Sequence, residues 1–111
     1  MFKPEQYFNA LSDATRLRSL LLLQVEGRLC VCELVHALDL SQPRVSRHLA
    51  MLRDLGIVVD ERVGQWVHYR LHPELPDWAA DVLAAAARAH DLNGLRKRLC
   101  CMPNRPTPVT A

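Results

Sequence analysis

Apolar positions in the first half of the chain recur at intervals of three and four residues, the spacing that places them on one face of an α-helix. Three helices are predicted on this basis, over residues 13–26, 30–38 and 41–55, and a short helix over residues 4–11 is predicted to begin at Pro4. Ser12 or Asp13 is suited to cap the second helix, and Gly27 to end it. In the same way Ser41 is the expected N-cap of the fourth helix, which Gly56 should end.

After the fourth helix the period changes from helical to two, which is the spacing of a strand. Residues 57–62 and 66–71 are therefore predicted to form two strands, joined by a turn at residues 63–65. A helical pattern resumes at Asp77. Its larger apolar side chains and alanines form a seam at alternating intervals of four and three that suits a partner helix: Trp78, Val82, Ala85, Ala89 and Leu92.

The predicted order of elements is α-α-α-α-β-β-α, with Asn93-Gly94 expected to break the last helix. This is the order of a winged helix-turn-helix, a mainly α fold with a β-hairpin wing (α+β class). Residues 1–102 are assigned to one domain, and residues 103–111, which contain three prolines, are predicted to be a disordered tail. Because a domain of this length hides only about 65% of its unfolded surface, its thin core favours a homodimer.

Charge is placed unevenly along a chain whose net charge is only +2. Residues 41–56 carry three arginines against Asp54, and residues 88–105 carry five Lys and Arg side chains against Asp91. Such basic zones favour an anionic partner, here double-stranded DNA. There is no run of about 18 apolar residues that would indicate a membrane span, and the N-terminus lacks the order of a signal peptide. The expected location is therefore the cytoplasm.

The fourth helix carries the candidate DNA-reading side chains. In a helix-turn-helix the second helix enters the major groove with its N-terminal end towards the bases, and that end here holds Ser41, Gln42, Arg44, Ser46 and Arg47. Arginine pairs with guanine edges and glutamine with adenine edges. Arg62 and Gln65, at the hairpin tip, are placed to touch phosphate or the minor groove. The competing interpretation is an ordinary solvated surface.

Four cysteines form two close pairs, Cys30 with Cys32 and Cys100 with Cys101. In a reducing compartment such pairs are typical of soft-metal ligands or redox thiols. Residues two apart on a regular helix point about 200° apart around its axis, so Cys30 and Cys32 are expected to share one ion only if the helix start distorts. The alternative is a pair of small buried apolar residues. Cys100 and Cys101 follow three cationic side chains, which favour the thiolate form of both cysteines. The alternative interpretation of Cys100 and Cys101 is that they have no fixed role.

Four segments resemble the ArsR-type (ArsR/SmtB) metalloregulatory repressors, and specifically the arsenical-resistance operon repressors. They are the opening of the second helix at residues 11–18, the cysteine-containing box at 29–34, the recognition helix at 40–49 and the wing at 64–71. The resemblance implies a homodimer, joined through its first and last helices, that binds operator DNA. It also implies that a metal or metalloid releases the DNA.

In arsenical members of that family, trivalent arsenic or antimony is held by three thiolates, and the resemblance implies that Cys30 and Cys32 supply two of them. Val35 departs from members that have a third cysteine at this position. The third thiolate would then come from Cys100 or Cys101, or be absent. The C-terminal pair would otherwise form a site of its own.

Other inducers and other functions compete with this interpretation. A repressor of the same fold would sense cadmium or lead, or thiol oxidation or persulfide, through the same cysteines. Zinc sensing is disfavoured because Asp81, His90 and Asp91 lack the family's ligand spacing. An enzyme is not expected, because no Cys-x-x-Cys motif and no base-and-orienter arrangement accompanies the thiols.

Overall fold

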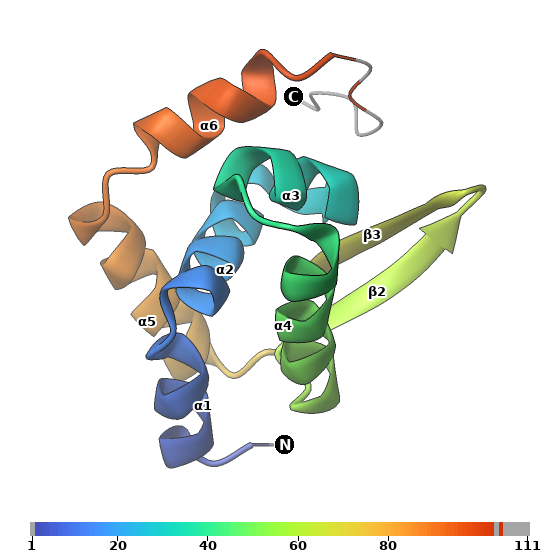
Figure 1. Cartoon of the computed structure of the whole chain (residues 1–111). Helices are drawn as coiled ribbons and strands as arrows, with labels where there is room; N and C mark the ends of the chain where they lie inside the picture. The colour runs from blue at the N-terminus through green and yellow to red at the C-terminus, as the bar shows by residue number, and fades with distance from the viewer. Residues whose placement is uncertain (1, 104, 106–111) are drawn as a thin grey trace.

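A computed structural model describes residues 2–103 and 105. In chain order these residues form α1 (Pro4–Leu11), α2 (Ala14–Glu26), β1 (Arg28–Cys30), α3 (Val31–Leu38), α4 (Gln42–Asp54), β2 (Val58–Val63), β3 (Trp66–Leu71), α5 (Asp77–Ala89) and α6 (Asn93–Cys100) (Figure 1). The predicted winged helix-turn-helix is confirmed. The sequence did not predict β1 and α6.

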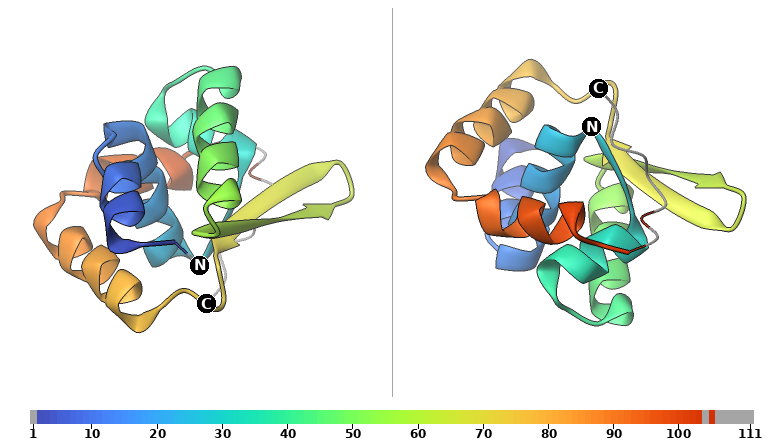
Figure 2. Two further views of the ribbon diagram at one scale, coloured as in Figure 1. Left: turned by 90° about the horizontal axis from the view of Figure 1, so that it is seen from below. Right: turned by 90° about the horizontal axis from the view of Figure 1, so that it is seen from above.

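The centre of the fold is α2. Residues 20–23 are four consecutive leucines, and all four are buried, because α1, α3, α4, α5 and β3 all pack around this helix (Figures 1 and 2). Asp13 begins the helix, since its side chain accepts a hydrogen bond from the backbone N–H of Arg16 at 3.1 Å. Gly27 ends it with φ 89°, a conformation that glycine adopts without strain.

The helix-turn-helix consists of α3 and α4. Asp39 closes α3 in the left-handed conformation (φ 56°, ψ 48°) and so turns the chain towards α4. Ser41 is the N-cap of α4, as predicted, although its side chain makes no capping hydrogen bond. Pro43 lies in the first turn, where a backbone N–H has no helical partner to lose. Three fully buried side chains fix α4 on the core: Val45, Leu49 and Leu52.

The three strands form an antiparallel sheet in the order β1-β3-β2. The hairpin of β2 and β3 was predicted to within one residue, and Gly64 and Gln65 form its turn. The short strand β1 pairs with β3, so that Leu29 faces Tyr69 and Cys30 faces His68. The start of α3 is therefore tied directly to the wing.

The C-terminal part differs from the prediction. A new helix, α6, begins at Asn93, where a break was expected, and packs against α3 (Figure 1). Leu92 is 8% exposed and belongs to the chain's own core, so its assignment to the partner-facing seam was wrong. The reason is that α5 ends at Ala89 and the chain then turns inwards. Apart from Pro103 and Arg105, the predicted disordered tail lies outside the described residues.

No helix within the described part of the chain has the length and apolar character to cross a membrane.

Candidate functional site

The N-terminal half of α4 presents the side chains predicted to read DNA. Ser41, Gln42, Arg44 and Arg47 are exposed, and Ser46 is half-buried. They are held in place because the opposite side of the helix is anchored in the core. Two guanidinium groups are thus available to an anionic partner on a helix that is itself fixed.

The hairpin of β2 and β3 projects away from the helices in both views of Figure 2. Gly64 allows the tight turn at its tip with φ 62°. Arg62 and Gln65 are exposed there, and Trp66 beside them is 37% exposed. The predicted wing residues therefore lie at the tip of an extended arm.

Arg16 and His48 connect α4 to the turn between α1 and α2. Arg16 Nη1 lies 3.2 Å from His48 Nδ1, and Arg16 Nε donates to the carbonyl of Ala10 at 2.8 Å. His48 Nε2 lies 3.9 Å from Asp13 Oδ1. The hydrogen bond from the Arg16 backbone lowers the pKa of Asp13. Sequence reasoning assigned His48 no role, although its place at the flank of the apolar face was the available signal.

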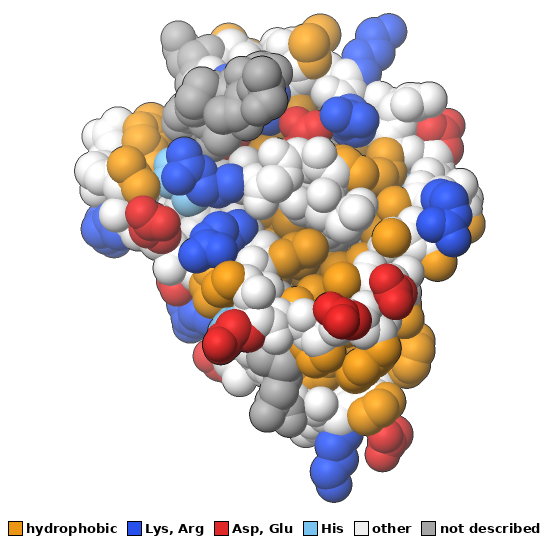
Figure 3. All heavy atoms as spheres, turned by 180° about the vertical axis from the view of Figure 1, so that it is seen from behind, with side chains coloured by type: hydrophobic (Ala, Val, Ile, Leu, Met, Phe, Trp, Pro, Cys, Tyr) orange, Lys and Arg blue, Asp and Glu red, His pale blue; other side chains and the backbone are white. Residues whose placement is uncertain are grey.

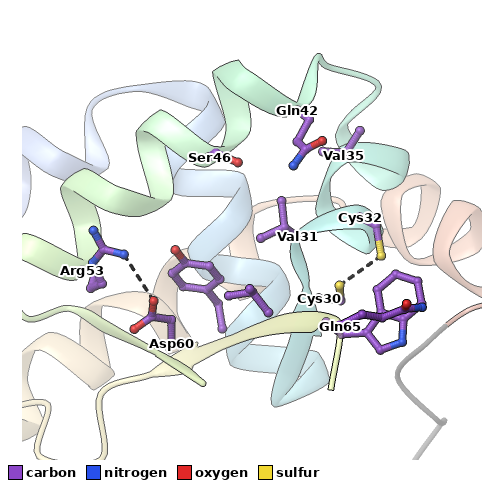
Figure 4. A pocket seen from close by; sticks show the side chains of 12 residues that line it. Cys30, Val31, Cys32, Val35, Gln42, Ser46, Arg53, Asp60 and Gln65 are labelled. Carbon is purple, nitrogen blue, oxygen red and sulfur yellow. Dashed lines mark hydrogen bonds and ion pairs between the residues drawn. The ribbon is translucent and has the colours of Figure 1, made fainter. Parts of the chain in front are cut away.

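Cys30 and Cys32 lie side by side rather than on opposite sides of a helix. Cys30 is the last residue of β1 and the N-cap of α3, with extended φ −74° and ψ 152°, so the angular spacing of a helix does not apply to it. The Cys32 thiol donates to Cys30 Sγ, with 3.0 Å between the sulfurs (Figure 4). The expectation that the helix start must unwind to bring the two together was therefore wrong.

The thiol pair has the chemistry of a soft-ion site. Cys30 is only 3% exposed. Burial, and then the hydrogen bond with Cys30, raises the pKa of Cys32 to about 12, so a bound ion would displace its proton. With metal–sulfur bonds of about 2.3 Å, two sulfurs on one centre lie roughly 3.3–3.8 Å apart. The pair would therefore hold one thiophilic ion once its sulfurs move apart by roughly 0.3–0.8 Å.

A buried carboxylate supports the backbone of Cys30. Glu33 is fully buried, and its Oε1 accepts a hydrogen bond from the Cys30 N–H at 2.8 Å. Arg105 pairs with it through Nε, and Arg105 Nη2 lies 3.1 Å from Glu26 Oε1. The buried charge is therefore compensated. Sequence reasoning missed these roles, although Cys30 and Glu33 have the spacing of a capping box.

The C-terminal cysteines stand apart from this pair. Cys100 is the last residue of α6, and both Cys100 and Cys101 are exposed. Within residues 2–103 and 105, there is no group of three or more His, Cys, Asp and Glu side chains that could hold a metal ion. The structure brings Cys30 and Cys32 together and leaves the other two cysteines outside their cluster.

A cavity of about 530 Å³ opens beside the thiol pair (Figure 4). Its walls come from the start of α3, from α4 and from the hairpin. Arg53 of α4 and Asp60 of β2 form an ion pair at 3.2 Å within this wall. One cavity therefore touches the cysteines, the DNA-reading helix and the wing.

Comparison with known proteins gives consistent matches. Residues 13–59 match the model of the bacterial regulatory proteins of the arsR family. The chain is 52% identical over 109 residues to the arsenic resistance transcriptional regulator ArsR1 of Pseudomonas putida, covering 96% of this chain and 85% of that protein. It is 54% identical over 85 residues to the arsenical resistance operon repressor of Escherichia coli, and the match covers 77% of this chain and 73% of that protein. The crystal structure of the AntR antimony-specific transcriptional repressor superposes with a TM-score of 0.64 at 31% identity, covering 75% of this chain and 72% of that one.

Proposed function

The chain belongs to the arsR family and is a DNA-binding transcriptional repressor rather than an enzyme, and on that premise we propose that it represses an arsenical-resistance operon and is released by trivalent arsenic or antimony. The observation that carries this proposal is the pair of thiols 3.0 Å apart at the start of α3. Cys30 is the N-cap of α3 and Cys32 lies in its first turn, so the pair sits at the beginning of the first helix of the proposed DNA-binding motif. Relatives named for arsenic resistance, identical at about half of the aligned positions, support the same inducer class.

Cys30 and Cys32 would hold the ion. A trivalent metalloid bound there supplies a thiophilic centre that accepts the sulfur electron pairs. The protein's part is to hold two sulfurs in one place, which it does by fixing Cys30 between β1 and α3. A contribution from Cys100 or Cys101 would require the end of α6 to approach this pair, because the described residues form no cluster of three ligands.

Operator binding would use the exposed end of α4 and the wing. Arg44 and Arg47 suit guanine edges and Gln42 an adenine edge, while hydroxyl groups and the wing suit the sugar–phosphate backbone. The full set proposed to contact DNA is Ser41, Gln42, Arg44, Ser46, Arg47, Arg62 and Gln65.

Release would follow from the position of the thiols. A ligand that needs the sulfurs further apart than 3.0 Å displaces the start of α3, which is bonded to β3 on one side and leads into α4 on the other. A ligand that favours the displaced form must weaken DNA binding by the same coupling free energy. Couplings of this kind are typically about 1–3 kcal/mol per site.

The functional unit would be a homodimer joined through α1 and α5. Phe8 on α1 is 53% exposed and Trp78 on α5 is 37% exposed, and their ring centroids are 6.5 Å apart. Ala85 and Ala89 are exposed further along α5. Figure 3 shows hydrophobic side chains gathered on the side where α5 lies. Two copies would present two recognition helices to two operator half-sites.

The test is release of the purified protein from a fluorescent fragment of its own promoter, followed by anisotropy during titration with arsenite, antimonite, cadmium, zinc and peroxide. Arsenite and antimonite should release the wild type. Cys30→Ser and Cys32→Ser should keep operator affinity within roughly twofold but need at least about tenfold more arsenite, since an alcohol is a poor ligand for a thiophilic centre. Cys100→Ser with Cys101→Ser is the matched control. Full arsenite release of the Cys30→Ser, Cys32→Ser double variant would sink the proposal.

The short distance between the sulfurs of Cys30 and Cys32 also favours an alternative function, a repressor that senses oxidation or a divalent ion. Two sulfurs 3.0 Å apart also suit two-electron oxidation by peroxide to a disulfide, and they would accept cadmium or lead. One of the two thiols could instead take a sulfane sulfur from a persulfide donor, which leaves as a thiol. Release by peroxide that dithiothreitol reverses, with no response to arsenite, would support a redox sensor. Release by cadmium alone would support a divalent-ion sensor.

A further inference from the structure

The space beside the thiol pair is larger than a bare metalloid ion needs. The cavity measures about 530 Å³, whereas a cavity of about 150 Å³ is enough to hold benzene. Val31 and Val35 contribute apolar wall from α3, and Trp66 and Val67 contribute it from β3. This volume lies in the range of small-molecule sites, which combine apolar walls with a few polar groups.

An apolar side chain, that of Val35, stands where a third ligand could join the two thiols. Val35 lies three residues after Cys32, on the same face of α3, and both line the cavity (Figure 4). In the described residues no His, Cys, Asp or Glu completes a group of three with the two thiols. Trivalent arsenic forms three bonds, so two thiolates leave one bond to be made by something other than this cluster.

We propose that the preferred ligand of this site is a monosubstituted trivalent arsenical, R–As(OH)₂, whose organic group occupies the cavity between α3, α4 and the wing. The inference rests on the proposed function and specifies its ligand class. In the reaction two As–O bonds break and two As–S bonds form, and each thiol proton leaves with a hydroxide as water. The As–C bond is retained and nothing is oxidised or reduced.

The position of the organic group also bears on release. Gln42 and Ser46 line the same cavity from the DNA-reading helix, and Gln65 lines it from the wing (Figure 4). A group seated there contacts the two elements that would hold the operator. An arsenical with an organic substituent therefore acts on α4 directly as well as through the start of α3.

The experiment compares phenylarsine oxide with sodium arsenite in the full-length, reduced protein that carries Cys100→Ser and Cys101→Ser. This background removes the adjacent C-terminal pair, which would itself bind a phenylarsenical. Calorimetry should give one phenylarsine per chain, bound at least about tenfold more tightly than arsenite because the ring is removed from water. Mass spectrometry of the adduct should show loss of two waters for each hydrated arsenical bound.

Two substitutions in that background distinguish the contribution of the apolar cavity wall to binding from the contribution of the thiols. Trp66→Ala should weaken phenylarsine binding about tenfold and leave arsenite binding unchanged. Val35→Cys supplies a third thiol on the same helix face, so it should tighten arsenite about tenfold or more and reverse the preference. Val35→Ala is the control for loss of the valine side chain, and it should not tighten arsenite.

The outcomes are distinguishable. Equal affinity for the two arsenicals, unchanged by Trp66→Ala, would overturn the assignment of the cavity. Tight arsenite binding by the wild type that is lost with Cys100→Ser and Cys101→Ser would also overturn this assignment, since the third thiolate would then come from the C-terminal pair. The proposal that the protein senses arsenic would still stand in that case. If neither arsenical binds or releases the operator, the proposed function itself fails.

Discussion

Cys30 illustrates how the backbone of one residue decides what a Cys-x-Cys pair can bind. In an α-helix the two side chains would diverge. Cys30 instead keeps the extended conformation of β1 and only its carbonyl side enters α3, so its sulfur lies 3.0 Å from that of Cys32. Residue spacing alone gives the wrong geometry here because the helix begins between the two cysteines.

Glu33 should matter for stability more than an ordinary glutamate. Glu33→Ala leaves the buried Cys30 N–H without its acceptor and removes one partner of Arg105, which should cost about 1–3 kcal/mol in the free energy of unfolding. Urea denaturation measures this cost. Glu74→Ala, at an exposed position, is the control and should change stability by less than about 0.5 kcal/mol. Equal effects of the two substitutions would contradict the role given to Glu33.

Arg44 and Arg47 should contribute to affinity for DNA without contributing to the fold. Both are exposed on α4, so Arg44→Ala and Arg47→Ala should leave urea denaturation unchanged. Each should weaken operator binding by about 1–3 kcal/mol if it reads a base. Arg88→Ala, which removes an exposed arginine of α5, should leave affinity nearly unchanged. Operator binding at wild-type strength in both α4 variants would exclude these residues from the interface.

At the scale of elements, the helices from α1 to α5 and the hairpin could be predicted from local signals. Most of these elements have several apolar residues at the spacing of a helix or of a strand. The strand β1 could not be predicted, because three residues are too few to show alternation and it is defined by pairing with β3. The helix α6 could have been found from Leu92, Leu95 and Leu99, which follow at intervals of three and four. The Asn93-Gly94 pair obscured that pattern, since it is typical of a turn and here begins a helix.

The first turn of α2 should depend on Asp13 in a pH-dependent way. Asp13→Ala removes the acceptor for the Arg16 N–H and should lower stability by about 1 kcal/mol at pH 7. The pKa of Asp13 is lowered in the folded protein from an ordinary 3.8. Its contribution is therefore present above pH 3.8 and is lost as the pH falls through the lowered value.

Urea denaturation from pH 7 to pH 2 tests this dependence. The wild type and Asp13→Ala should converge in stability at the acid end. Asp13→Asn caps nearly as well as aspartate, so it should retain most of the stability at pH 7 and lose this part of the pH dependence. A constant difference between wild type and Asp13→Ala at every pH would show that the charged carboxylate is not what stabilises the helix start.

In the whole molecule, three parts of the proposed mechanism meet in one place that the sequence alone could not assemble. The cysteines flank the first residue of α3, the recognition residues begin α4, and the wing follows some twenty residues later, yet all three border one cavity. Motifs identify each part from a short segment. Their common wall depends on how α3, α4 and β3 pack, which is set by long-range burial rather than by any local pattern.

The exposed face of α5 is the proposed contact between the two subunits of the dimer. Ala85 and Ala89 are exposed on the same side as Trp78, and small side chains permit close approach of a partner helix. Ala89→Glu would place charge in that contact and should weaken dimerisation at least about tenfold. Sedimentation velocity at micromolar concentration measures the loss.

Ala80→Glu is the matched control for that substitution. Nine residues separate Ala80 from Ala89, which is two and a half helical turns, so this exposed alanine points away from the seam. Its variant should remain a dimer. Because a dimer holds two half-sites through one interface, Ala89→Glu should also lower operator affinity while leaving thiol binding to phenylarsine oxide unchanged. If Ala89→Glu remains dimeric at micromolar concentration, the two chains must meet through a surface other than α5, and the apolar face of α1 and α5 would need another partner.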